Sequence, residues 1–271
     1  MSQLPFAATT PISVARVGLK ARNAEALARY YRETVGLNEI SRSNGTISMG
    51  AGARPLLMLE ADPSAREDDP HSAGLFHTAF LLPNRADLGR WVKHAIEKRI
   101  PIDGASDHLV SEALYLTDPE GNGIEIYADR ARETWTRDGD GIALATNKLD
   151  IPDLLAAVPA GDAGWQGAPE NSVVGHVHLR VGDPVVAEEW WHSQFGFDTM
   201  AKYGADAVFL ASGGYHHHIG ANSWRSRGAR PRDDGRTGLA WVEMRSSLTE
   251  KPSELKDSWG TVIRTVPGMM T

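Results

Sequence analysis

The sequence has no cysteine among its 271 residues. This absence excludes disulfides, thiolate metal sites and cysteine nucleophiles, so a metal site must be built from His, Asp or Glu. No apolar run approaches the ~20 residues of a membrane-spanning helix. The net charge is −7 and the basic residues form no stripe, which argues against nucleic acid as a partner. The first twelve residues lack the features of a signal peptide, and we expect a cytoplasmic protein without membrane or nucleic-acid partners.

An internal repeat organises the chain. Three short motifs recur 160 residues apart without a gap. Residues 19–23, 30–31 and 35–38 correspond to residues 179–183, 190–191 and 195–198. Both copies predict a strand followed by a helix, with Asn23 or Asp183 as the N-cap. Gly36 and Gly196 suit the left-handed position just past a helix end. The chain is therefore expected to repeat one structural unit.

The repeat extends to four units of strand, helix and further strands, at residues 12–62, 72–129, 173–222 and 237–271. The fourth unit is short. It offers one strand, a charged helix candidate at 248–259 and an apolar strand at 261–266. We expect an α+β fold in which four βαβββ-type modules, the fourth short, pair into two half-barrel domains.

The expected domain boundaries follow from these units. An N-terminal domain at 1–130 contains the first two modules, and a C-terminal domain at 173–271 contains the other two. Residues 131–172, rich in Asp, Gly, Ala and Pro, are expected to form a linker with a short helix near 151–158.

Residues able to bind a metal occur at corresponding places in the second and third units. His77 and His176 open these units, and Glu125 lies on the closing strand of the second. Two imidazoles and one carboxylate can form the facial triad of non-heme Fe(II) sites. Taken alone, Glu125 between two isoleucines can simply face water, as alternating strand residues do. The matched histidines favour a metal site formed where the second and third units pack together, with the first and fourth units as a metal-free half.

Three consecutive histidines, His216, His217 and His218, stand near the end of the third unit. On a strand, His216 and His218 would share one face and His217 would take the other, so they cannot all serve one site. One of them is expected to be left over for catalysis. His108, Trp135, Tyr215 and Trp224 are further candidates for lining a pocket, each on weak grounds.

These residues resemble the vicinal oxygen chelate superfamily, and within it the extradiol dioxygenases of the catechol 2,3-dioxygenase type. The similarity covers nearly the whole chain and is most specific at residues 74–82, 107–127, 175–179 and 214–220. It implies that His77, His176 and Glu125 bind the metal. It also implies that Tyr115, ten positions before Glu125, hydrogen-bonds the substrate, and that His217 is the catalytic acid and base, with His218 as the alternative. Better-known members place their ligands in the third and fourth units instead.

The same resemblance implies Fe(II) as the cofactor, with Mn(II) also compatible with the ligands. The substrates would be O2 and catechol or a substituted catechol, which would be cleaved to a 2-hydroxymuconic semialdehyde. Two alternatives stay open, namely a glyoxalase-like metal-dependent isomerase or lyase and a non-catalytic ligand-binding protein of the resistance type. Exposed sheet edges beside the short fourth unit lead us to expect a homo-oligomer.

Overall fold

The structure is a computed structural model that describes residues 3–268. Each of the first three units forms a strand, a helix and three further strands. The first contains β1 (Ile12–Ala21), α1 (Ala24–Tyr30), the π-helical turn η2 (Tyr31–Val35), β2 (Asn38–Ser43), β3 (Thr46–Ala51) and β4 (Arg54–Ala61). The second contains β5 (Gly74–Leu81), α2 (Arg85–Lys98), β6 (Gly104–Asp107), β7 (Ser111–Thr117) and β8 (Gly123–Asp129). The third contains β12 (Val173–Arg180), α4 (Pro184–Phe195), β13 (Asp198–Tyr203), β14 (Ala207–Ala211) and β15 (Ile219–Asn222).

Up to residue 268, the fourth unit contains strands only: β16 (Gly238–Ser246), β17 (Ser253–Lys256) and β18 (Val262–Pro267). The helix expected at 248–259 is therefore wrong. Pro252 disfavours a helical conformation of the residue before it. The residues after it gain backbone hydrogen bonds by pairing antiparallel with β18.

The segment between the second and third units holds the small elements η3 (Arg132–Thr134), β9 (Arg137–Asp138), β10 (Gly141–Ile142), β11 (Asn147–Lys148) and α3 (Ile151–Ala156). Helix α3 confirms the short helix expected near 151–158, and the side chain of Asp150 caps it by accepting a hydrogen bond from the Asp153 amide. A further helical turn, η1 (Phe6–Ala8), precedes β1.

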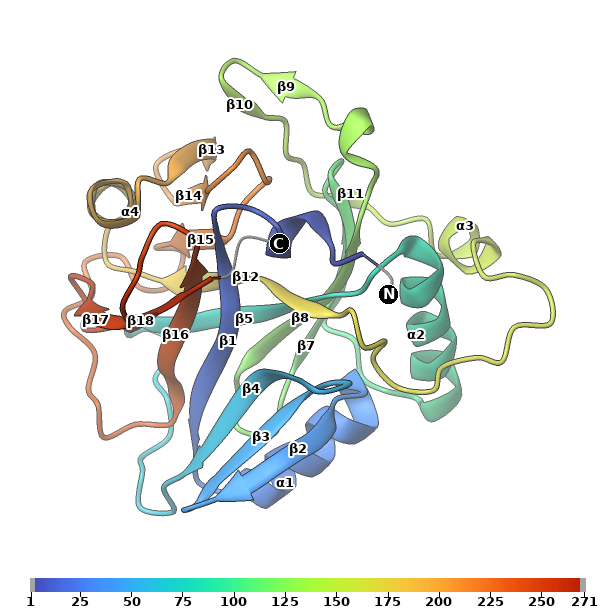
Figure 1. Cartoon of the computed structure of the whole chain (residues 1–271), viewed down its shortest axis with the longest axis horizontal. Helices are drawn as coiled ribbons and strands as arrows, with labels where there is room; N and C mark the ends of the chain where they lie inside the picture. The colour runs from blue at the N-terminus through green and yellow to red at the C-terminus, as the bar shows by residue number, and fades with distance from the viewer. Residues whose placement is uncertain (1–2, 269–271) are drawn as a thin grey trace.

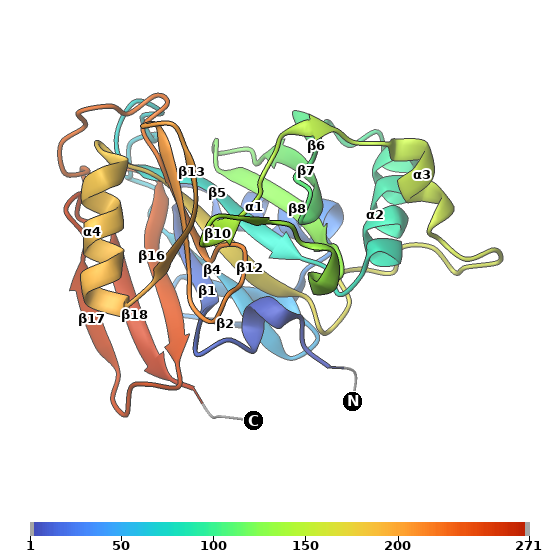
Figure 2. The ribbon, with the colours of Figure 1, turned by 90° about the horizontal axis from the view of Figure 1, so that it is seen from above.

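The large strands form two sheets, in the orders β17-β18-β16-β1-β4-β3-β2 and β11-β6-β7-β8-β5-β12-β15-β14-β13 (Figure 1). The outer units thus share one sheet and the middle units share the other. Helices α2 and α3 lie at one end of the molecule and α4 at the other in both views (Figures 1 and 2). The α+β class with curled sheets is confirmed. Each sheet takes strands from both 1–130 and 173–271, and the domain boundaries stay a prediction.

The repeat correctly placed the helix ends. Asn23 accepts a hydrogen bond from the Ala26 amide, and Asp183 accepts one from the Val185 amide. Gly36 and Gly196 have φ values of 85° and 62° in the left-handed region. Among residues 3–268, no helix is long and apolar enough to cross a bilayer.

The main core lies between the two sheets and under the helices. In β8, Ile124, Ile126 and Ala128 point into this core. Because successive strand residues face opposite sides, Glu125 and Tyr127 point to the other face of the nine-stranded sheet. A smaller cluster of buried residues, which includes Tyr127 and Tyr215, lies on that face. This second face is where the candidate site is built.

Candidate active site

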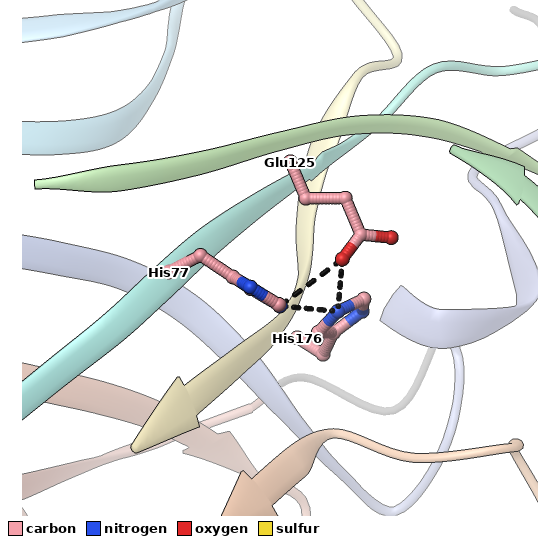
Figure 3. A group of neighbouring side chains, drawn as sticks. All are labelled: His77, Glu125 and His176. Atoms are coloured by element: carbon pink, nitrogen blue, oxygen red, sulfur yellow. Dashed lines mark hydrogen bonds and ion pairs between the residues drawn. The ribbon is translucent and has the colours of Figure 1, made fainter. Parts of the chain in front are cut away.

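Three neighbouring strands bring the expected metal ligands together. Strand β5 lies between β8 and β12, and Ala79 is the register partner of both Glu125 and His176. His77 is two residues before Ala79 and therefore faces the same side of the sheet. Figure 3 shows the side chains of His77, Glu125 and His176 pointing toward one another from these three strands. They are the potential metal-binding group found in the described part of the chain.

The three ligand atoms form a compact triangle. Glu125 Oε2 lies 3.0 Å from His77 Nε2 and 3.2 Å from His176 Nε2, and the two nitrogens are 3.4 Å apart. Three ligands at about 2.1 Å from one ion and at right angles would lie about 3.0 Å from each other. The observed triangle therefore fits the size of one transition-metal ion bound on one face.

The charges of these groups also fit a bound cation. Burial alone would raise the pKa of Glu125, but His176 and His77 outweigh this effect and hold it well below its usual range. Burial lowers the pKa of His176 to about 4, against the opposing effect of Glu125. Among residues 3–268, no Lys or Arg forms an ion pair with Glu125. A buried carboxylate that is paired with no Lys or Arg can accept the charge of a divalent ion.

Tyr115 stands opposite Glu125 in the antiparallel pair of β7 and β8. Burial and the charge of Glu125 raise the pKa of its hydroxyl well above the usual range, so the hydroxyl stays protonated. Its oxygen lies 2.5 Å from His108 Nε2, and His108 Nδ1 lies 2.6 Å from the Ala145 carbonyl oxygen. Because a carbonyl oxygen can only accept, His108 Nδ1 donates to Ala145, and Nε2 is the ring nitrogen that contacts the Tyr115 hydroxyl.

The sequence led us to expect the three consecutive histidines on a strand, but they lie outside one. A turn at Gly213 and Gly214, both with positive φ, places them in the irregular segment before β15. His217 lines the cavity, and its ring centroid lies 4.1 Å from that of His176. Burial and the neighbouring imidazoles lower the pKa of His217 well below its usual range.

The other two histidines of the run point elsewhere. His218 Nε2 lies 2.9 Å from the Ala7 carbonyl oxygen and 3.1 Å from Thr10 Oγ1, away from the cavity. His216 Nε2 lies 2.9 Å from Asp129 Oδ1. Of the three, the geometry therefore favours His217 as the residue that meets a ligand.

A cavity of about 440 Å³ opens at the triangle. Its lining is His77, Glu125, His176, His217, Tyr115, His108, Phe76, His178, Phe209, Trp224, Tyr203, Ser106, Val110, Ser111, Leu144, Ala145 and Thr146. Glu125 is the only carboxylate in this lining, and no Lys or Arg appears in it. The size suits a small aromatic molecule. Trp224 lines it as expected, whereas Trp135 and Tyr215 are not part of the lining.

His178 is the residue that sequence reasoning missed. It follows His176 by two positions on β12, so strand alternation alone could have placed it on the same face. Its ring packs near those of Phe76 and Trp224, and its buried Nε2 has no hydrogen-bond partner within residues 3–268. A Cβ at Gly220 would come within 2.8 Å of this ring, so the glycine makes room for it.

Comparisons with known proteins agree with this arrangement. The model of the Glyoxalase/Bleomycin resistance protein/Dioxygenase superfamily matches residues 13–126. Catechol-2,3-dioxygenase of Bacillus subtilis (strain 168) is 42% identical over 225 residues, which cover 82% of this chain and 78% of the relative. Biphenyl-2,3-diol 1,2-dioxygenase 3 of Rhodococcus globerulus is 37% identical over 67 residues, which cover 23% of this chain and 33% of the relative. Glyoxalase I from Zea mays shares the fold, with a TM-score of 0.58 at 13% identity over 97% of this chain and 94% of its own.

Fold and site together describe a protein of paired βαβββ units that carries a buried cluster of His and Glu on one curled sheet. The chain belongs to the Glyoxalase/Bleomycin resistance protein/Dioxygenase superfamily, as the resemblance implied. Its relatives by sequence place it among the dioxygenase enzymes of that superfamily.

Proposed function

We propose that this chain is an extradiol ring-cleaving dioxygenase. Its substrates would be O2 and an uncharged catechol, and its product a 2-hydroxymuconic semialdehyde or a substituted form of it. The triangle of His77, Glu125 and His176 at the wall of the cavity is the observation that carries this proposal. The similarity to Catechol-2,3-dioxygenase of Bacillus subtilis supports the same reaction.

His77, His176 and Glu125 would hold Fe(II), and the same donor atoms are also suited to Mn(II). When bound, such an ion supplies a Lewis acid for the catechol hydroxyls and a source of electrons for O2. The chain's part is to present two imidazoles and one carboxylate without rearrangement, because all three are already buried and in place.

His217 is proposed as the acid and base. A neutral imidazole can take the proton of a catechol hydroxyl and later return it to the opened product. The lowered pKa of His217 keeps the ring neutral before the substrate enters, which is the state that a base requires.

Tyr115 is proposed to position the substrate. His108 and Glu125 hold its hydroxyl at the cavity wall, where it can form a hydrogen bond with a catechol oxygen. This is the role that the resemblance implied for Tyr115, a hydrogen bond to the substrate. The rings of Phe76, Phe209 and Trp224 complete an apolar wall that can contact the aromatic ring and exclude water.

The isomerase alternative has less support. A glyoxalase-like proton shuttle needs a second carboxylate beside the metal, and Glu125 is the only carboxylate in the cavity lining within the described residues. Anaerobic addition of Fe(II) and catechol, followed by air, tests the proposal. A yellow product near neutral pH is expected, and metal-loaded protein that leaves catechol unchanged in air would contradict it.

A further inference from the structure

One carboxylate oxygen outside the cavity joins two hydrogen-bond chains. Asp129 is the last residue of β8, and its Oδ1 lies 3.2 Å from the Tyr215 hydroxyl and 2.9 Å from His216 Nε2. None of these three residues lines the cavity. An ionised carboxylate can only accept hydrogen bonds, so both Tyr215 and His216 must donate to it.

The tyrosine chain leads to a proposed metal ligand. Because Tyr215 gives its only proton to Asp129, its oxygen must accept in the 2.8 Å hydrogen bond with the Tyr127 hydroxyl. Tyr127 therefore donates to Tyr215 and accepts from His176 Nδ1, which lies 3.2 Å away. The proton of His176 is thus held on Nδ1, and the lone pair of Nε2 points into the triangle.

The histidine chain leads to the proposed acid and base. When the His216 ring carries one proton, which Nε2 donates to Asp129, its Nδ1 has only a lone pair. The Nδ1 atoms of His216 and His217 lie 2.8 Å apart, so the proton between them must belong to His217. Nε2 of His217 is then left as the nitrogen that can accept a proton from a substrate.

We propose that Asp129 is a positioning residue that fixes the proton on Nδ1 of both His176 and His217, one through Tyr215 and Tyr127 and the other through His216. A half-buried carboxylate at the end of one strand thereby prepares a metal ligand and a base together. Partners of this kind that hold a ligating histidine in one tautomer contribute about 10- to 100-fold in metal affinity. The half of this inference that concerns His217 rests on the proposed function, whereas the half that concerns His176 needs metal binding alone.

The test separates the two chains by substitution. Tyr215→Phe interrupts the tyrosine chain, His216→Phe interrupts the histidine chain, and Asp129→Leu removes the shared acceptor. Fe(II) affinity is measured anaerobically by competition with a chelator, and turnover of catechol is measured at saturating Fe(II). Tyr31→Phe serves as a matched control, because this buried tyrosine donates to Asp118 in another part of the core. Melting temperatures show that each variant is folded.

We expect Tyr215→Phe to weaken Fe(II) binding about tenfold or more. We expect His216→Phe to lower turnover about 100-fold while Fe(II) binding changes little. Asp129→Leu should both weaken Fe(II) binding and lower turnover. In the double variant with Tyr215→Phe, Fe(II) binding should be no weaker than in Asp129→Leu alone, because both substitutions interrupt the same hydrogen-bond chain.

Fully additive losses in the double variant, or an Asp129→Leu protein with normal Fe(II) affinity, would overturn the proposal. A wild-type protein that binds Fe(II) but cleaves no catechol would remove the proposed function. In that case the effects of Tyr215→Phe and Asp129→Leu on Fe(II) affinity still decide the inference about His176.

Discussion

The hydroxyl of Tyr115 lies 2.5 Å from Nε2 of His108, and the His108 ring is itself fixed by the Ala145 carbonyl. This contact orients the Tyr115 oxygen at the cavity wall. Tyr115→Phe should therefore lower kcat about 10- to 100-fold by removing a hydrogen bond to the reacting oxygens. Metal content should be unchanged, because Tyr115 is not part of the triangle. Iron analysis and steady-state kinetics on the same preparation measure the metal content and kcat. An unchanged kcat would show that Tyr115 does not position the substrate.

His217→Ala should separate metal binding from catalysis. The side chain lines the cavity but lies outside the triangle of ligand atoms. We expect full Fe(II) content and a fall in turnover of about 10²–10⁴-fold, the usual contribution of an acid and base. His218→Gln offers a matched control in the same segment, since its amide can still donate to the Ala7 carbonyl. Equal losses in both variants would indicate damage to the segment instead.

The cavity lining predicts selectivity against anionic substrates. Within the described residues, no Lys or Arg lines the cavity to pair with a carboxylate substituent, and Glu125 already brings one negative charge. We expect kcat/KM for 3,4-dihydroxybenzoate to be at least about 100-fold below that for 4-methylcatechol, because an unpaired charge is costly to bury. Comparable values for the two compounds would show that another group enters the site with the substrate.

Stability should fall with acid because of His218. Burial lowers its pKa from 6.5 to about 3, against the opposing effect of its hydrogen bond to Ala7. Between these two values the unfolded chain binds a proton that the folded chain does not, so the free energy of unfolding decreases as the pH falls. The full contribution is present above about pH 6.5 and is lost progressively below it. Melting temperatures between pH 8 and 5 measure this slope, which should be shallower in His218→Gln.

The sequence predicts the units well and the connections between them less well. Repeated caps and glycines marked the helices of the first and third units, because local hydrogen bonds fix a helix end. The helix expected at 248–259 failed because pairing with β18, a long-range contact, decided the conformation of residues 253–256. Charge and periodicity within that segment do not reveal such a partner.

The same distinction applies to the site. The grouping of His77, Glu125 and His176 could be predicted because each stands on an opening or closing strand of a repeated unit. Choosing among the three consecutive histidines required the actual path of the chain through Gly213 and Gly214. Asp129 could not be recognised from sequence, since its partners Tyr215 and His216 are more than 80 residues away and meet it only after β15 joins the sheet.

The most direct test of the account is anomalous X-ray diffraction at the iron edge from crystals grown with Fe(II) without oxygen. The account predicts one peak at bonding distance from Nε2 of His77, Nε2 of His176 and a carboxylate oxygen of Glu125, and its loss or marked weakening in Glu125→Gln. A peak held by other residues, or one that keeps its full height in Glu125→Gln, would contradict the metal centre on which the proposed dioxygenase activity depends.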